Sequence, residues 1–425
     1  MRRVSVCLLA LSLTFAVGCD DDSDPLRPDS GRVDAGGDDG ETTYYEDVRP
    51  ILVENCVMCH DEGGIAPFRL ETYAQVTEVA ERVREATALR IMPPFLADNS
   101  GDCQTYENHR GLTQEEIDTI GAWVDQGTLE GDATTPMPEA AVLPTLSSVD
   151  LTIEMEMDYS VLEETDDDYR CFVVDPGLTE NAYVTGYDVH PGNAQRVHHV
   201  IVYNPVDEAA EQRALELDME DGTMGDGYPC YGGAIVDAPP LVLWAPGTGA
   251  TRFPRGTGIE LEAGRQQIIQ VHYNNLVDEG VATTDRTTID LQTSDTALQA
   301  YLLPVLNTGL SLPPRMESVS SSRTLDLSFL PANVRIFGVM PHMHTLGRTL
   351  SVEIQRPTET ECAVDVPRWD FNWQLAYWYD DPIRISPEDS ATITCTYNTM
   401  SRDETTTWGD GTQDEMCIAF VYVSL

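Results

Sequence analysis

From residue 148 onward, apolar and polar residues alternate along many short segments, and this period of two constrains the fold more than any other feature. Successive side chains of a β-strand point to opposite faces, so such alternation is typical of half-buried strands. The segments are 151–157, 198–203, 265–273, 287–293, 349–355, 390–397 and 417–423. About 280 residues is generous for one sandwich, so we expect two jelly-roll-like, all-β sandwich domains, 148–297 and 298–425.

The region before these segments has a helical period. Apolar residues recur at helical spacing in 44–55 and 71–90, and a capping box opens a third helix at Thr113. Residues 132–147 contain three prolines and no helical pattern, so they form a linker. The expected architecture is multidomain: a small all-α domain at 43–131, followed by the two sandwiches.

The helical region contains Cys-Val-Met-Cys-His at positions 56–60, and Cys-x-x-Cys-His is the attachment pattern of a c-type haem. We expect Cys56 and Cys59 to hold the haem covalently, His60 to bind the iron, and Met92, on a loop stiffened by prolines, to be the sixth ligand, with His109 as its rival. A zinc site would need a second ligand pair nearby. The region resembles a small cytochrome c domain.

The first nineteen residues have a basic start, an apolar run too short to span a membrane, and small residues before Cys19. This is the pattern of a secretory signal peptide. Its end resembles a bacterial lipobox, in which Cys19 is lipidated, although ordinary cleavage after Gly18 is the alternative. Residues 20–42 carry nine acids and few large apolar residues, which predicts a disordered tether.

The charge balance is strongly acidic, with a formal net charge of −47 from 25 basic and 72 acidic residues. Such a surface argues against binding nucleic acid or anionic lipid through a basic face. We therefore expect an exported protein of the bacterial cell envelope, facing the periplasm or the cell surface, which contacts the membrane only through its lipid anchor.

Five of the eight histidines lie in strand-like segments flanked by apolar residues. They are His198, His199, His272, His342 and His344. Any one of them alone is more simply a structural residue, but together they form an imidazole-rich set, which suits copper, zinc or iron. Adjacent residues of an ideal strand face opposite ways. His198 and His199 therefore share a metal only if the strand is locally twisted or their rings bind through different nitrogens.

A methionine ligand would identify the metal, because a thioether favours Cu(I). Met343 points away from its flanking histidines on a strand, and Met340 precedes a proline that breaks the strand. Met416, in the segment Asp-Glu-Met-Cys, is the better candidate.

The order His-His-Val, Gln-Val-His-Tyr, His-x-His and Asp-Glu-Met-Cys is similar to the copper type II monooxygenases, the group of peptidylglycine α-hydroxylating and dopamine β-monooxygenases. The resemblance implies two β-sandwiches with one copper each. It assigns an electron-transfer copper to His198, His199 and His272, with Gln270 in the second coordination shell. It assigns the O2-binding, catalytic copper to His342, His344 and Met416. It also implies the disulfides Cys171–Cys230 and Cys395–Cys417, while Cys103 and Cys362 either bridge the haem domain to the second sandwich or stay free.

The sequence departs from the peptide-hydroxylating members at two places. They have an Arg where this chain has Met340 and an Asn where it has Ile418, so peptide amidation is not expected. The site is more apolar, which favours a small organic substrate. The aromatic residues Trp369, Phe371, Trp373 and Trp378 either line the site or belong to the core.

The predicted function is hydroxylation of a C–H bond with O2, using two copper ions and one covalently bound haem c that relays electrons. The reductant is ascorbate or an exported redox partner protein. The alternative is a non-catalytic, exported electron-transfer or copper-binding lipoprotein. A carbohydrate- or partner-binding sandwich would leave the histidines and Met416 as coincidence.

Overall fold

The computed structural model describes ten stretches of the chain. They are 40–62, 66, 68–107, 109–139, 142–163, 165–220, 225–275, 280–409, 411 and 413–425. The expected signal peptide, with Cys19, and almost all of the expected tether lie outside the described residues. Residues 41–425 form one compact unit. None of the described helices is long and apolar enough to cross a membrane.

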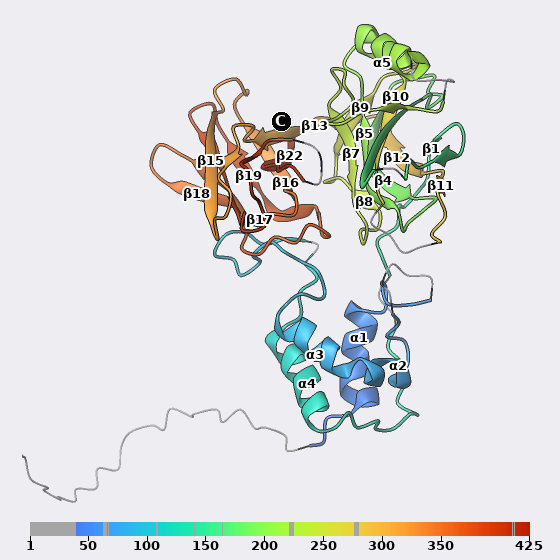
Figure 1. The fold of residues 1–425 in the computed structure, drawn as a ribbon, viewed down its shortest axis with the longest axis vertical. Coiled ribbons are helices and arrows are strands. Elements are labelled where there is room, and N and C mark those ends of the chain that lie inside the picture. The colour runs from blue at the N-terminus through green and yellow to red at the C-terminus, as the bar shows by residue number, and fades with distance from the viewer. Residues whose placement is uncertain are drawn as a thin grey trace, which may run out of the picture. The chain divides into compact units, whose positions relative to one another are not determined.

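The helical region has short elements around a small core (Figure 1). They are the π-helical turn η1 (Tyr44–Val48) and the helices α1 (Arg49–Asn55), α2 (Tyr73–Glu78), α3 (Ala80–Ala88) and α4 (Gln114–Asp125). The capping box expected at Thr113 is present, and a second one at Thr72 opens α2. Leu52, Ile120 and Trp123 are buried at the centre of this region.

The expectation of a small all-α cytochrome c domain followed by two all-β domains is wrong. Strands account for 36% of the structure and helices for 14%, and the helical region belongs to the same compact unit as the sheets. The stretch between α3 and α4 has no helical period, so its apolar side chains must be buried elsewhere. Leu96, Ala97 and Tyr106 join the core of the second β region. A helix, α5 (Glu208–Glu220), also contacts β3 and β6 in the first β region.

Twelve strands lie in the described part of the first β region. They are β1 (Leu151–Glu154), β2 (Tyr159–Ser160), β3 (Asp167–Val174), β4 (Ala182–His190), β5 (Val197–Tyr203), β6 (Tyr228–Pro229), β7 (Pro240–Trp244), β8 (Thr251–Arg252), β9 (Thr257–Leu261), β10 (Gln267–Asn274), β11 (Thr284–Asp285) and β12 (Thr288–Ser294). A five-stranded sheet, β6-β3-β10-β5-β7, packs against the sheet that contains β1-β12-β4-β9. Val184, Val200, Ile269 and Ile289 are buried between the two sheets.

Ten strands lie among the described residues of the second β region. They are β13 (Leu298–Leu306), β14 (Ser311–Leu312), β15 (Val319–Asp326), β16 (Val334–His342), β17 (Gly347–Gln355), β18 (Thr360–Val366), β19 (Tyr377–Ile385), β20 (Ser390–Tyr397), β21 (Thr406–Thr407) and β22 (Ile418–Ser424). The four-stranded sheet β15-β20-β17-β18 packs against β13-β22-β16-β19. Because β13 also pairs with β9, one nine-stranded sheet runs through both regions.

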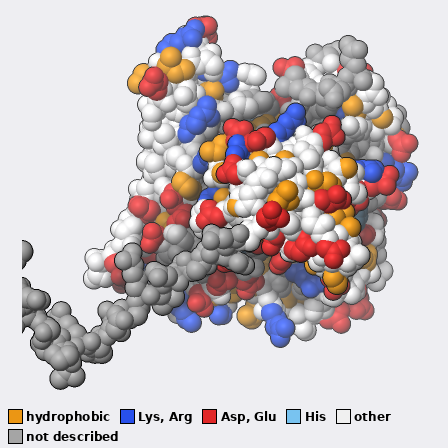
Figure 2. Space-filling model, turned by 90° about the horizontal axis from the view of Figure 1, so that it is seen from below, with side chains coloured by type: hydrophobic (Ala, Val, Ile, Leu, Met, Phe, Trp, Pro, Cys, Tyr) orange, Lys and Arg blue, Asp and Glu red, His pale blue; other side chains and the backbone are white. Residues whose placement is uncertain are grey.

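The surface agrees with the composition. Acidic side chains outnumber basic ones on the face shown in Figure 2.

The disulfide Cys103–Cys362 ties the stretch between α3 and α4 to β18. The same stretch forms a bridge between Tyr106 and Tyr379, whose rings stack with centroids 5.7 Å apart. If both cysteines are changed to serine, we expect amides near residue 103 to exchange faster, because a disulfide of this kind contributes about 2–4 kcal/mol. Hydrogen–deuterium exchange measures this, with Cys171→Ser/Cys230→Ser, which removes a disulfide outside this stretch, as the control. Unchanged exchange would mean that packing alone holds the stretch.

Candidate metal centre

Three predicted ligands meet where β5 pairs with β10. His272 lies opposite His199, and the register then shifts so that Tyr273 lies opposite Val197. His198 is therefore the extra residue of a β-bulge, which re-aims its side chain out of the normal alternation. The candidate ligand atoms of the three histidines lie within 4.8 Å of one another. The bulge explains how two adjacent histidines can face one point.

The hydrogen bonds of this cluster leave ring nitrogens without a partner. Nε2 of His272 lies 2.9 Å from a carboxylate oxygen of Asp167, which places the proton on Nε2 and the lone pair on Nδ1. That Nδ1 lies 3.4 Å from Nδ1 of His199, while Nδ1 of His198 is buried with no partner among the described atoms. Buried polar atoms nearly always have a partner. A cation between the three rings would supply it, so these residues fit a metal.

Burial keeps these imidazoles neutral. It lowers the pKa of His198 to about 3 and the pKa of His199 well below its usual value. The pKa of His272 is also lowered by burial, against the opposing effect of Asp167. Neutral imidazole is the form that binds a metal, so protons do not compete for these nitrogens near neutral pH.

The two histidines of the second set lie at and just after the end of β16. Nδ1 of His342 lies 2.6 Å from the side-chain oxygen of Gln374, and Nδ1 of His344 lies 3.1 Å from the carbonyl oxygen of Asp414. Both contacts fix the tautomer and leave Nε2 as the nitrogen available to a metal. Burial lowers the pKa of His342 to about 3 and also lowers that of His344.

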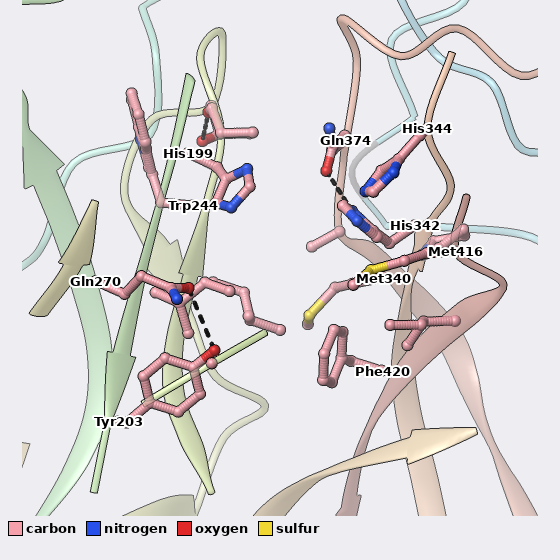
Figure 3. A pocket seen from close by; sticks show the side chains of 18 of the residues that line it. His199, Tyr203, Trp244, Gln270, Met340, His342, His344, Gln374, Met416 and Phe420 are labelled. Atoms are coloured by element: carbon pink, nitrogen blue, oxygen red, sulfur yellow. Dashed lines mark hydrogen bonds between the residues drawn. The ribbon is translucent and has the colours of Figure 1, made fainter. Parts of the chain in front are cut away.

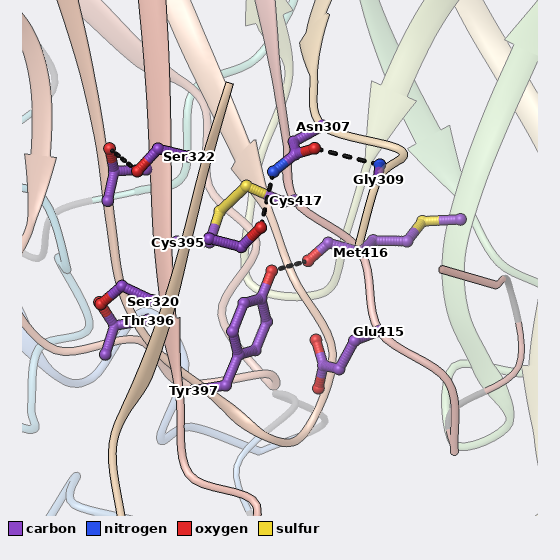
Figure 4. The surroundings of a disulfide bond; sticks show 12 residues. Asn307, Gly309, Ser320, Ser322, Cys395, Thr396, Tyr397, Glu415, Met416 and Cys417 are labelled. Atoms are coloured by element: carbon purple, nitrogen blue, oxygen red, sulfur yellow. Dashed lines mark hydrogen bonds between the residues drawn. A yellow bond between two sulfur atoms is a disulfide. The ribbon is translucent and has the colours of Figure 1, made fainter. Parts of the chain in front are cut away.

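Met416 lies beside these two histidines on the same wall of a pocket (Figure 3). The hydroxyl of Tyr397 donates to its carbonyl oxygen at 2.9 Å, and the next residue forms the disulfide Cys395–Cys417 (Figure 4). The backbone of Met416 is therefore held by β20 and by a covalent bond. The buried side chain of Met343 belongs to the core of the second β region, as expected for a residue that points away from the histidines.

Three residues that hold these side chains were not found from the sequence. Asp167 and Gln374 position His272 and His342, as described above. Glu415 is buried, and its carboxylate accepts hydrogen bonds from the backbone N–H groups of His344, at 3.1 Å, and Leu346, at 2.6 Å. Burial raises the pKa of Glu415 to about 7. In the sequence, the role of Glu415 was indicated only by its position next to Met416. Gln374 lies in a loop whose sequence has no recognisable pattern.

One pocket of about 150 Å³ is lined by His199 of the first set and by His342, His344 and Met416 of the second. The rings of His199 and His342 are 6.2 Å apart between centroids. In Figure 3, His199, Trp244 and Tyr203 lie on one wall, and His342, Met416 and Phe420 lie on the other. The pocket thus has the candidate ligands of both β regions in its walls.

Of the four aromatic residues that were expected to line the site or belong to the core, two lie next to candidate metal ligands. Phe371 stacks on His198 with centroids 4.6 Å apart, and the indole N–H of Trp369 donates to the carbonyl of His344 at 3.2 Å. Trp373 and Trp378 pack against the two cores. None of these four lines the pocket.

Two positions that distinguish this chain from the peptide-hydroxylating members, Met340 and Ile418, do line the pocket. Gln270 lines it as well. Its amide nitrogen donates to the carbonyl of Cys230 at 2.8 Å, and its oxygen accepts from Tyr203 at 3.4 Å. These bonds go to the supporting strands rather than to a histidine.

The described cysteines form three disulfides, Cys103–Cys362, Cys171–Cys230 and Cys395–Cys417. Disulfides persist in oxidising compartments outside the cytoplasm, so they indicate an exported protein.

Cys56 and Cys59 are unpaired. Burial raises the pKa of Cys56 to about 12 and also raises that of Cys59, which is unlike a reactive redox pair. Nδ1 of His60 lies 3.0 Å from the carbonyl oxygen of Phe68, so its Nε2 is available to an iron. These three residues fit a covalently held haem.

The two candidates for the sixth haem ligand line a second cavity, which is separate from the pocket between the histidine clusters. Met92 and His109 both line it, and the ring of His109 lies 4.8 Å from that of Phe95. His60 is not among the described residues that line this cavity.

Two β-sandwich regions thus bring buried histidines to a shared pocket. Residues 153–279 match the copper type II ascorbate-dependent monooxygenase N-terminal domain, and residues 301–423 match the C-terminal domain. The two matches together cover more than half of the chain. The chain belongs to the copper type II ascorbate-dependent monooxygenase family.

Three individual proteins are similar to this chain, each over part of its own length. Human dopamine beta-hydroxylase is 25% identical over 417 residues, which cover 90% of this chain and 63% of that protein. Human DBH-like monooxygenase protein 1 is 24% identical, and tyramine beta-hydroxylase of Caenorhabditis briggsae is 26% identical. Each of these two alignments covers 55% of this chain and 40% of the relative. The chain thus spans between 40% and 63% of the length of these relatives.

Among solved structures, the major capsid protein P2 from Bacteriophage PM2 aligns at 11% identity over 61% of this chain and 97% of that chain. Its TM-score is 0.25, which is too low to argue a shared fold.

Removing the carboxylate of Asp167 should weaken metal binding at the three-histidine cluster. We expect Asp167→Ala to lower copper affinity there by about 10–100-fold, because the His272 ring loses the partner that fixes its tautomer. Titration against a chromophoric chelator, in a His342→Ala/His344→Ala background, isolates this cluster. The exposed neighbour serves as the control, so Asp166→Ala should leave the affinity unchanged. Equal affinities in all three proteins would show that Asp167 does not act on the metal.

Proposed function

We propose that the protein is a copper-dependent monooxygenase that hydroxylates a C–H bond of a small organic substrate. One oxygen atom of O2 enters the C–H bond, and the other leaves as water after the uptake of two electrons and two protons. The observation that carries the proposal is the pocket itself. His199 of the three-histidine cluster lies in one wall, and His342, His344 and Met416 lie in the other.

We assign an electron-transfer copper to His198, His199 and His272. A second, catalytic copper belongs to His342, His344 and Met416, where a thioether favours the reduced ion. When bound, these coppers supply electron transfer at the first cluster and O2 activation at the second. The neutral state of the imidazoles, the bulge at His198 and the free Nε2 atoms of the second pair support this assignment.

The protein's own side chains hold this arrangement in place. Asp167 and Gln374 fix the imidazole tautomers, and Glu415 holds the turn that carries His344. Apolar side chains such as Met340 and Phe420 make the pocket a poor place for water, which protects a reactive oxygen species from side reactions.

We also propose that Cys56 and Cys59 carry a haem, with His60 on the iron and Met92 as its partner in the haem-loaded protein. This haem would relay electrons to the coppers from an exported redox partner, with ascorbate, named in the family description, as the other reductant. The two unpaired thiols and the free Nε2 of His60 support the proposal. The predicted lipid on Cys19 would hold the protein at the cell envelope.

Met416 provides the direct test of catalysis. Met416→Ile keeps the apolar volume but removes the thioether, so we expect the catalytic site to lose copper while the three-histidine cluster keeps it. Substrate hydroxylation should fall at least about 100-fold, since even supporting residues of metal sites cost roughly 10–100-fold when removed. Copper per chain by elemental analysis, and ascorbate-driven O2 uptake with product detection, measure the two effects.

The exposed Met400 gives the matched control, because Met400→Ile should change neither quantity. Redox cycling of both proteins without any hydroxylated product would instead favour a non-catalytic electron-transfer protein.

The haem proposal is tested on the chain's own cysteines. In cells that attach c-type haems, we expect the purified protein to carry the mass of one haem and the absorption spectrum of a haem c. Cys56→Ser/Cys59→Ser should lose both, whereas Cys103→Ser/Cys362→Ser should keep both. Wild-type protein without covalent haem under these conditions would refute the attachment.

A further inference from the structure

His198 differs from other candidate ligands in how its ring is held. The ring of His272 is oriented by the carboxylate of Asp167, and that of His342 by the side-chain oxygen of Gln374. Nδ1 of His198 is instead buried with no hydrogen-bond partner among the described atoms. His198 is also the extra residue of the bulge, so regular strand pairing does not fix it either. The orientation of this ring therefore has to come from packing.

The ring of His198 packs against Phe371, which belongs to the other β region. The two rings are nearly parallel, with centroids 4.6 Å apart and planes 20° apart, which is a favourable stacked arrangement. Phe371 lies between β18 and β19, in residues 369–374, which we call the bridging loop. Both residues line a third cavity, of about 630 Å³, so His198 lies at the edge of open space rather than in a close-packed core. The stack with Phe371 is therefore the contact that limits rotation of this imidazole.

The bridging loop also holds both histidines of the second set. The indole N–H of Trp369 donates to the carbonyl oxygen of His344 at 3.2 Å. The side-chain nitrogen of Gln374 donates to the carbonyl oxygen of Phe371 at 3.1 Å, and its side-chain oxygen lies 2.6 Å from Nδ1 of His342. A displacement of Phe371 would therefore move the partner of His342 as well. One short loop contacts candidate ligands of both sets.

We propose that Phe371 is a positioning residue for His198, and that the bridging loop makes metal binding at the two sets mutually dependent. The proposal rests on the two copper sites of the proposed function. When His198 is bound to a metal, its ring is fixed and gives Phe371 a rigid surface, which orders the loop and sets Gln374 in place for His342. Because coupling between two binding sites is reciprocal, a metal at the second set favours binding at the first by the same factor.

The role of Phe371 is tested by Phe371→Leu, which keeps an apolar side chain but removes the flat ring. We expect copper affinity at the three-histidine cluster to fall about three- to tenfold, the effect of one aromatic pair. A chelator titration in the His342→Ala/His344→Ala background measures it. Phe371→Tyr keeps the ring face and should restore the affinity. Phe329→Leu, at a 74% exposed phenylalanine of the same β region, is the matched control. Equal affinities in the Leu and Tyr variants would overturn the positioning role.

The coupling is tested with His272→Ala, which disables the three-histidine cluster but keeps His198 against Phe371. We expect the second set to bind copper at least about fivefold more tightly in the unaltered protein than in His272→Ala. With Phe371→Leu added to both proteins, this ratio should fall to about one. Chelator titration gives the affinities, and copper–sulfur scattering in X-ray absorption reports the second set, because its proposed ligands alone include a thioether.

The outcomes separate this proposal from the function on which it rests. Unaltered protein that holds no copper at either set would remove the two-copper function and the coupling with it. Copper at both sets with a ratio of about one, or a ratio that Phe371→Leu leaves unchanged, would remove the coupling through Phe371 alone.

A measurement with Phe371 intact covers the case in which Phe371→Leu does not fold. In Met416→Ile we expect copper only at the three-histidine cluster. Adding copper to this protein should slow hydrogen–deuterium exchange of the amides in the bridging loop, because a fixed His198 ring orders Phe371. Exchange in the loop that does not change on copper binding would overturn the proposal.

Discussion

The pairing of β9 with β13 sets the separation of the two histidine clusters. It is short, with Leu298 opposite Thr257 and Gln299 opposite Gly258, yet it makes the sheets of the two β regions continuous. Gly258 is required there, because a Cβ would come within 2.9 Å of the Val184 carbonyl oxygen. The hydroxyl of Thr257, 2.8 Å from that of Tyr422, reinforces the junction. A pocket with ligands from both regions in its walls depends on this contact.

A short chain of contacts connects the helical region to His342 in the second set of candidate ligands. The hydroxyl of Tyr377 accepts a hydrogen bond from the backbone N–H of Leu96, and its ring lies 5.0 Å from that of Phe95. Three residues before Tyr377, Gln374 binds the ring of His342. A conformational change in the stretch between α3 and α4 can therefore be transmitted to His342 through residues 374–377. The helical region is therefore in contact with the second β region rather than a separate domain.

The sequence predicted those structural features that depend on interactions between neighbouring residues. The period of two located the strands, and the capping box at Thr113 located α4, because alternation and capping are properties of neighbouring residues. The histidine motifs were visible for the same reason. The bulge at His198 and the support from Gln374 arise from contacts between distant segments. No spacing in the sequence encodes them, and the docking of Leu96 and Tyr106 into a sheet core was missed for that reason.

The absence of charged side chains from the described walls of the pocket affects the candidate ligands. The protein carries a net charge of −47, but its acids are kept out of this lining, and Asp167 and Glu415 act from behind the histidines. Desolvation without a nearby anion in the pocket lowers the pKa of His342 to about 3, so the imidazole stays free of protons and open to a metal. A carboxylate introduced into these walls would have the opposite effect, because a nearby anion raises the pKa of the ligand histidines and lets protons compete with a metal.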